Sequence, residues 1–165
     1  MIIRMTLDLP AEATFVSLVR NLAETLLTDM GVVREVIEDI ELIVGEVCAN
    51  AVRHAYDNPE DRYQVSLDFC KDQFVISVRD HGKGADPSRF HDDPTELREG
   101  GRGVMLVRAL SDRFDFHVEN GTTIRSIVHL HYRSQGHATR AAEMDTNNAR
   151  VTVQSRPQVD DTAQA

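Results

Sequence analysis

The motif Asp80-His81-Gly82-Lys83-Gly84 follows an alternating apolar segment and combines a carboxylate with two glycines. Glycine lets the backbone approach a ligand closely, and an ionised aspartate can accept a hydrogen bond from an exocyclic amine. Aspartate and glycine are also the commonest residues of plain turns. Taken alone, the motif therefore leaves a ligand site and a simple turn equally open.

A second glycine cluster, Gly100-Gly101-Arg102-Gly103, leads directly into a short segment with helical periodicity. Free backbone N–H groups and the positive end of a helix dipole make such a junction a natural anion site. A flexible start to a short helix is the alternative. The chain has no G-x-x-x-x-G-K-[ST] phosphate loop and no G-x-G-x-x-G after a first strand, which disfavours the common nucleotide-binding folds.

Glu46 and Asn50 form a third candidate, because residues four apart project from the same side of a helix. They fall at the margin of an apolar stripe, which would place a carboxylate and an amide at the rim of the core. An ordinary solvated helix edge has the same spacing. Taken alone, the pair is weak evidence for a functional site.

The elements that must position these residues follow from hydrophobic periodicity. Residues 3–9 alternate as a strand that Pro10 ends, and residues 11–30 have the spacing of an amphipathic helix that ends at Gly31. The apolar positions of this first helix are Phe15, Leu18, Val19, Leu22 and Leu26. A longer helix is predicted over residues 32–56, with the stripe Val36, Ile40, Ile43, Val47 and Ala51.

The second half of the chain is predicted to be mainly β-structure. Residues 63–69 and 74–78 alternate around a turn, and residues 114–118 and 124–130 alternate around Asn120-Gly121, a strong hairpin signal. A long loop over 80–103 and a short helix over 103–111 lie between the two hairpins. This order predicts an α+β sandwich, with a mixed, mostly antiparallel sheet and helices on one face.

Composition limits the class of protein. A chain of 165 residues and 18.5 kDa is about one domain, and no apolar run approaches the roughly 20 residues that cross a bilayer. A net charge of −9 disfavours nucleic-acid binding. Cys48 and Cys70, with no signal-like start, are expected to be free thiols in the cytoplasm. Residues 134–165 are polar and are expected to form a flexible tail after a domain at 1–133.

The order of the three candidate motifs along the chain makes a functional site more strongly indicated than each motif does alone. The stretch from Glu46 to Tyr56, followed by the motif at 80–84, the glycines at 100–103 and Gly121-Thr122-Thr123, resembles the GHKL ATPase superfamily. Within it, the chain is most similar to the bacterial anti-sigma-factor serine/threonine kinases of partner-switching systems. The resemblance covers about residues 1–133 and leaves the tail outside.

The resemblance implies an ATP site that uses Mg²⁺. Asn50 would ligate the Mg²⁺ that bridges the ATP phosphates, and Glu46 would be the general base, one helical turn away. Asp80 would recognise the adenine amino group, and residues 85–99 would form the ATP lid. The remaining residues implied in nucleotide binding are Gly82 and Gly84 at the base, Gly101, Arg102 and Gly103 at the phosphates, and Thr123 near the adenine.

The cation that would face the γ-phosphate stays open at this point. Lys83, Arg98 and Arg102 all lie near the glycine motifs, and each taken singly is more typical of a solvated surface charge. None is assigned to catalysis.

The resemblance also implies partners. Such a kinase phosphorylates a serine or threonine of a STAS-domain anti-anti-sigma protein and binds a sigma factor or another target, and it forms homodimers. The N-terminal strand, the first helix and Arg20 are candidates for a partner surface. No nucleic acid or membrane is expected as a partner.

Two other functions remain as alternatives. One is a detached ATP-binding domain of a histidine kinase, which the short lid and the absence of a preceding phosphoacceptor hairpin disfavour. The other is a protein-binding module that holds nucleotide without transferring phosphate. Because Glu46, Asn50 and Asp80 are all present, loss of activity is disfavoured.

Overall fold

The computed structural model describes residues 3–54, 61–81, 102–133 and 149–154. The described part contains a six-stranded sheet with the strand order β4-β5-β3-β2-β1-β6. Neighbouring strands are antiparallel except for β1 and β6, which are parallel. The strands are β1 (Ile3–Pro10), β2 (Arg62–Phe69), β3 (Gln73–Asp80), β4 (Arg113–Val118), β5 (Thr122–His129) and β6 (Ala149–Gln154).

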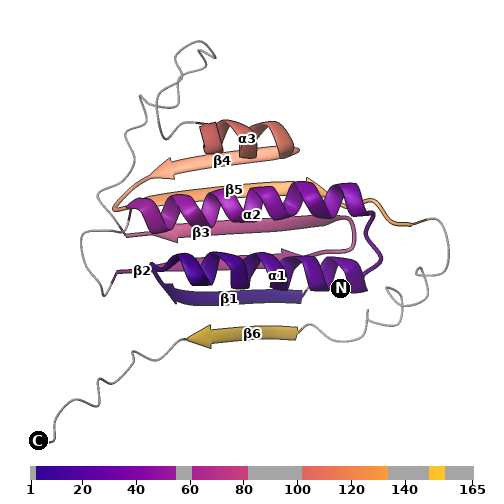
Figure 1. Ribbon diagram of the computed structural model, residues 1–165, viewed down its shortest axis with the longest axis horizontal. Coiled ribbons are helices and arrows are strands. Elements are labelled where there is room, and N and C mark those ends of the chain that lie inside the picture. The colour runs from indigo at the N-terminus through magenta and orange to yellow at the C-terminus, as the bar shows by residue number, and fades with distance from the viewer. Residues whose placement is uncertain (1–2, 55–60, 82–101, 134–148, 155–165) are drawn as a thin grey trace, which may run out of the picture.

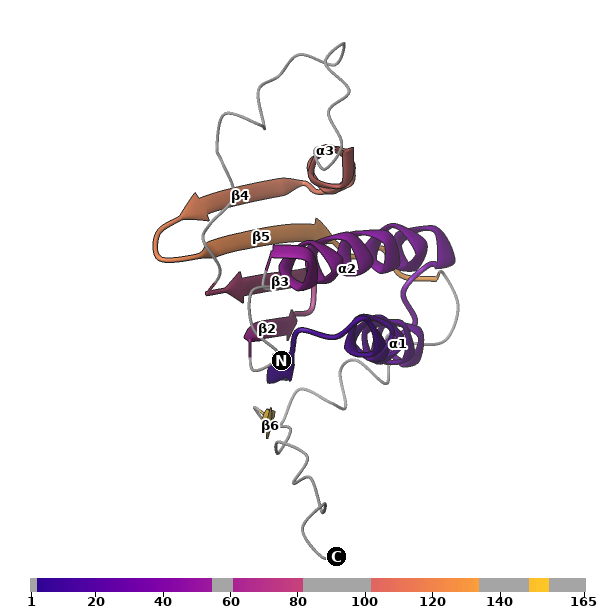
Figure 2. The same cartoon turned by 60° about the vertical axis from the view of Figure 1, so that its left-hand side comes forward.

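Three helices, α1 (Ala13–Asp29), α2 (Arg34–His54) and α3 (Arg102–Leu110), cover one face of this sheet. Figure 1 shows α1 over β1 and β2, α2 over β3 and β5, and α3 beside β4, and Figure 2 shows all three on the same side. The predicted α+β sandwich, with its mixed and mostly antiparallel sheet, is therefore confirmed. The observed helices begin and end within two residues of the predicted bounds.

The apolar stripe predicted for α2 is buried. Ile40, Ile43, Val47 and Ala51 are each at most 2% exposed and face the sheet. In α1 the prediction was partly wrong, because Leu18 is 52% exposed. The buried row of α1 follows the four-residue spacing of Val19, Ala23 and Leu27, which turns Leu18 away from the core.

Alternation along β3 and β5 places polar side chains beneath the helices. Val78 and Asp80 are both buried on the helix-facing side of β3, two residues apart. On β5 the same side carries Thr122 and Ile124, which are also buried. The two strands therefore present Asp80 and Thr122 at the end of a face that is otherwise mainly apolar.

The β4–β5 hairpin turns at Asn120-Gly121, as its sequence predicts. Both residues have positive φ, 50° at Asn120 and 115° at Gly121. A methyl group on Gly121 would also overlap the backbone carbonyl oxygen of Asp80. Gly121 thus serves both the turn and the close contact between β5 and the end of β3.

Strand β6 was not predicted. It lies within the segment expected to form a flexible tail, and residues 149–154 differ from that expectation by pairing in parallel with β1. Val151 and Val153 alternate with polar residues there, a short pattern that is weak by itself. The edge of β1 supplies the hydrogen-bonding partner, which no local pattern reveals.

Two glycine-to-alanine substitutions should have opposite effects on stability. Gly121→Ala should destabilise the protein by about 2–4 kcal/mol, because alanine tolerates neither the positive φ nor the overlap with Asp80. Gly45→Ala, in the middle of α2 with no atom within 4 Å of the added carbon, should stabilise it by about 0.5–1 kcal/mol. Urea unfolding of both variants measures the difference, and equal effects would contradict this account of Gly121.

Candidate functional site

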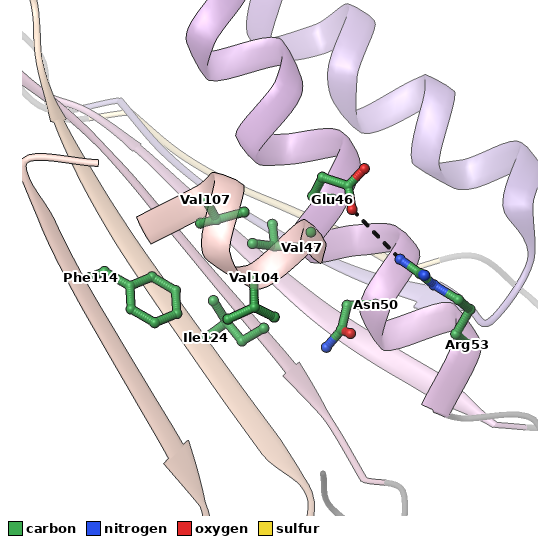
Figure 3. Close-up of a pocket in the computed structure, with 9 residues that line it drawn as sticks. Glu46, Val47, Asn50, Arg53, Val104, Val107, Phe114 and Ile124 are labelled. Carbon is green, nitrogen blue, oxygen red and sulfur yellow. Dashed lines mark ion pairs between the residues drawn. The ribbon is translucent and has the colours of Figure 1, made fainter. Parts of the chain in front are cut away.

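Helices α2 and α3 enclose a pocket with strands β4 and β5 at its base. Glu46, Asn50 and Arg53 of α2 form the polar side of this pocket, as Figure 3 shows. The empty space amounts to about 240 Å³, including the part open to solvent. The other lining residues are Val47, Gly103, Val104, Val107, Phe114 and Ile124.

Gly103 allows α3 to approach the carboxylate of Glu46. A side-chain carbon at position 103 would overlap Glu46 Oε2, so only glycine fits beside this carboxylate without movement. Gly103 lies in the first turn of α3, where backbone N–H groups have no partner within the helix. The start of α3 and the predicted general base are therefore in direct contact.

Arg53 forms an ion pair with Glu46 across the mouth of the pocket. Its Nη2 lies 3.6 Å from Glu46 Oε2, and its Nε donates a hydrogen bond to the carbonyl oxygen of Ala49 at 3.2 Å. The two side chains are 54% and 36% exposed, so solvent screens the pair. Figure 3 marks this contact with a dashed line.

Asn50 is buried in the pocket wall with an unsatisfied amide. Its exposure is 5%, and Nδ2 has no hydrogen-bond partner in the described part of the chain. Burying an amide donor without a partner destabilises a fold by about 1–3 kcal/mol, which is unusual outside functional sites. A half-turn of the amide would present Oδ1 in the same place, and amide oxygen is a group that Mg²⁺ accepts.

The donor set suits Mg²⁺ better than a metal held wholly by protein. The described ranges contain no cluster of three or more His, Cys, Asp or Glu side chains that could hold a metal ion. Mg²⁺ characteristically takes one or two protein oxygens and completes its octahedron with phosphate oxygens and water. Asn50 fits that role, because a nucleotide would supply most of the ligands.

Asp80 lies at the end of β3 and is not one of the residues that line the pocket. It is 2% exposed, and its Oδ1 accepts a hydrogen bond from the backbone N–H of Thr122 at 3.1 Å. Ile124, two residues further along the same face of β5, lines the pocket. The contact between Asp80 and Thr122 therefore extends the site along the ends of β3 and β5.

Thr122 shares a sheet face with Asp80, whereas Thr123, the threonine predicted from the sequence, lies on the other face. Thr123 pairs with Arg79 in the β3–β5 register, and both lie on the sheet face opposite the helices. Thr122 is 1% exposed and faces the same side as Asp80. Because side chains alternate along a strand, neighbouring residues such as these two project to opposite faces of the sheet.

The remaining predicted residues divide into two groups. Arg102 begins α3 and is exposed, but it does not line the pocket. The motif residues Gly82, Lys83, Gly84, Arg98 and Gly101 lie outside the described residues, as does the predicted lid at 85–99.

Arg53 lines the pocket, and the sequence analysis did not predict it as a site residue. Its position seven residues after Glu46, on the same helix face, is the signal that could have found it.

Comparison with known proteins identifies the fold family. The model of the histidine kinase-like ATPase domain matches residues 9–128. The chain belongs to this family. The resemblance of its motifs to the GHKL superfamily is thereby confirmed, and ATP is the ligand that such a domain uses.

The relatives have similar lengths to this chain. A protein of Bacillus velezensis named serine-protein kinase RsbW is 31% identical over 152 residues, which is 86% of this chain and 94% of the relative. A protein of the same name from Staphylococcus epidermidis is 32% identical over 133 residues, or 74% of this chain and 84% of the relative.

A crystal structure of the RsbU and RsbW domains of a Mycobacterium tuberculosis protein has the same fold. Its TM-score is 0.57 at 21% identity, and the match covers 79% of this chain. This chain spans only 34% of that larger protein. At this level of identity the match shows the fold alone. In the part of this chain that the structure describes, no helix is long and apolar enough to cross a membrane.

Replacing Asn50 should increase the stability of the protein without ligand and remove its stabilisation by ATP with Mg²⁺. Asn50→Leu has a similar volume and removes the unsatisfied amide, so the protein without ligand should gain about 1–2 kcal/mol in free energy of unfolding. The same variant should lose the increase in unfolding temperature that ATP with Mg²⁺ gives the parent protein. Thermal unfolding with and without ATP and Mg²⁺ measures both effects. A less stable variant that still responds to ATP would contradict this role of Asn50.

Proposed function

We propose that this chain is an ATP-dependent serine/threonine protein kinase of a bacterial partner-switching system. The observation that carries the proposal is the pocket between α2 and α3, where Glu46 and the buried Asn50 lie on one helix face. Membership in the histidine kinase-like ATPase domain family supports ATP as the phosphate donor. Relatives named serine-protein kinase, similar over most of their length, support a hydroxyl acceptor.

The adenine base would bind at the ends of β3 and β5. The buried Asp80 carboxylate would accept a hydrogen bond from the adenine amino group while Oδ1 keeps its bond to the Thr122 N–H. Thr122 replaces Thr123 in this role, since it shares the buried face with Asp80. Gly82 and Gly84 would shape the base pocket, as their motif implies.

The phosphates would then extend toward Asn50 and the start of α3. Gly101, Arg102 and Gly103 would meet them at this helix N-terminus, where free N–H groups favour anions. Asn50 would hold the accompanying Mg²⁺, which supplies positive charge to phosphate oxygens as the transfer proceeds. The unsatisfied amide of Asn50 supports this assignment.

Glu46 would act as the general base. Its carboxylate would take the proton of the acceptor serine or threonine as Oγ forms a bond to the γ-phosphorus. The bond from that phosphorus to the bridging oxygen breaks, and its electron pair stays on ADP. The side chain of Glu46 is 36% exposed at the pocket mouth, so an incoming hydroxyl can reach it.

The proposed partners follow the resemblance to anti-sigma-factor kinases. The substrate would be a serine or threonine of a STAS-domain anti-anti-sigma protein, and the second partner a sigma factor or an equivalent switch target. We place the protein in the cytoplasm, as a homodimer.

Glu46→Gln should abolish phosphate transfer without abolishing nucleotide binding. The rate of label transfer from ATP to a STAS-domain protein encoded beside this chain should fall by about 10²–10⁴-fold, because glutamine cannot accept the proton. The ATP dissociation constant should not increase. Glu35→Gln, at an exposed position in the first turn of α2, is the matched control and should transfer label normally.

The stability of the label identifies the acceptor. Phosphoserine or phosphothreonine survives acid, so acid-stable label on the STAS protein supports the proposal. Acid-labile, alkali-stable label would instead indicate a histidine kinase. ATP binding without any transfer to such proteins would favour a nucleotide-binding interaction module. Unchanged transfer by Glu46→Gln would remove Glu46 as the base.

Asp80→Asn should weaken ATP binding itself. If the asparagine keeps its oxygen on the Thr122 N–H, its NH₂ group faces the adenine amino group, and two donors meet. Losing a hydrogen bond to a charged group corresponds to a dissociation constant about 10–100-fold higher. Isothermal titration with ATP measures this change, and an unaltered constant would remove Asp80 from the adenine site.

A further inference from the structure

We propose that the Glu46–Arg53 ion pair is a latch that the nucleotide opens. In the empty site Arg53 holds the carboxylate of Glu46, and on ATP binding its guanidinium moves to the terminal phosphate and frees that carboxylate. This inference rests on the proposed kinase function and adds a positioning residue that acts on the general base.

The distance and the exposure of the Glu46–Arg53 ion pair make it easy to separate. Arg53 Nη2 stands 3.6 Å from Glu46 Oε2, beyond the usual hydrogen-bond distance, and more than half of the arginine side chain is exposed. Exposed ion pairs of this kind are weak. The hydrogen bond from Arg53 Nε to the Ala49 carbonyl keeps the base of the guanidinium group near α2, while Nη2 faces the pocket.

The position of Arg53 suits a phosphate that reaches Asn50. Arg53 is three residues after Asn50, and residues at this spacing lie about 5–6 Å apart between their Cβ atoms. Among the nine described residues that line the pocket, Arg53 is the only cation and Glu46 the only acid. Among these lining residues, a polyphosphate entering between α2 and α3 therefore meets Arg53 as its cation, and Arg53 is then paired with the base.

A phosphate is the stronger competitor for the guanidinium. Its oxygens carry more charge than one carboxylate and accept two parallel N–H bonds from arginine. Glu46 Oε2 lies beside Gly103 of α3, on the side of the pocket that the start of this helix forms. When Arg53 leaves, this oxygen loses its ion-pair partner and becomes available to accept a proton from the acceptor hydroxyl.

Nucleotide affinity tests the latch directly. Isothermal titration of ATP and ADP in the presence of Mg²⁺ should show about tenfold weaker ATP binding by Arg53→Ala, with ADP binding changed less than threefold. Arg53→Lys keeps the charge and should recover part of the ATP affinity. Arg79→Ala is the control for net charge, because Arg79 is exposed on the opposite face of the sheet. It should leave both affinities unchanged.

A double-mutant cycle separates a latch from a permanent ion pair. If Arg53 must leave Glu46 to bind phosphate, Glu46→Gln should tighten ATP binding more in the presence of Arg53 than in the Arg53→Ala background. If the pair stays closed when ATP binds, removing Arg53 exposes the phosphates to the charge of Glu46. The tightening by Glu46→Gln is then larger in the Arg53→Ala background.

The outcomes distinguish the latch from the kinase proposal. Failure of the parent protein to bind ATP would overturn the proposed function and the latch together. Normal ATP binding by the parent, with an unchanged ratio of ATP to ADP affinity in Arg53→Ala, would overturn the latch alone. The latch alone would also be overturned if Glu46→Gln tightened ATP binding equally with and without Arg53, or more strongly in the Arg53→Ala background.

Discussion

Helix α3 lies so close to α2 that residue 103 has no room for a side chain beside Glu46 Oε2. This contact places the carboxylate beside a helix start, where backbone N–H groups have no partner within the helix. It also closes one side of the pocket whose opposite wall carries Asn50. The acid, the amide and the N-terminal end of α3 are close together because this one approach is possible.

The same region contains polar groups that a stable core would avoid. Asn50 Nδ2 is buried with no partner among the described residues, and the Asp80 carboxylate is buried at the end of an apolar strand face. The described residues have one other unsatisfied buried side-chain atom, Tyr63 Oη, and burial raises the pKa of its hydroxyl. Desolvated polar groups oppose folding, and under the proposed function the nucleotide and its Mg²⁺ would give Asn50 and Asp80 further partners.

Local patterns predicted most of the fold. A period of two marks strands and a spacing of three to four marks helices, and Asn120-Gly121 requires the positive φ angles that the hairpin has. The patterns failed where a neighbour far along the chain decides the outcome. Strand β6 depends on the edge of β1, and the exposure of Leu18 depends on which row of α1 faces the sheet.

By itself, the sequence determined the elements, their order and the spacing that puts Glu46 and Asn50 on one helix face, because these are properties of neighbouring residues. Only the tertiary structure decided that Gly103 contacts Glu46 and that Thr122, rather than Thr123, lies beside Asp80. These choices depend on how helices and strands pack and on strand register, which long-range contacts set.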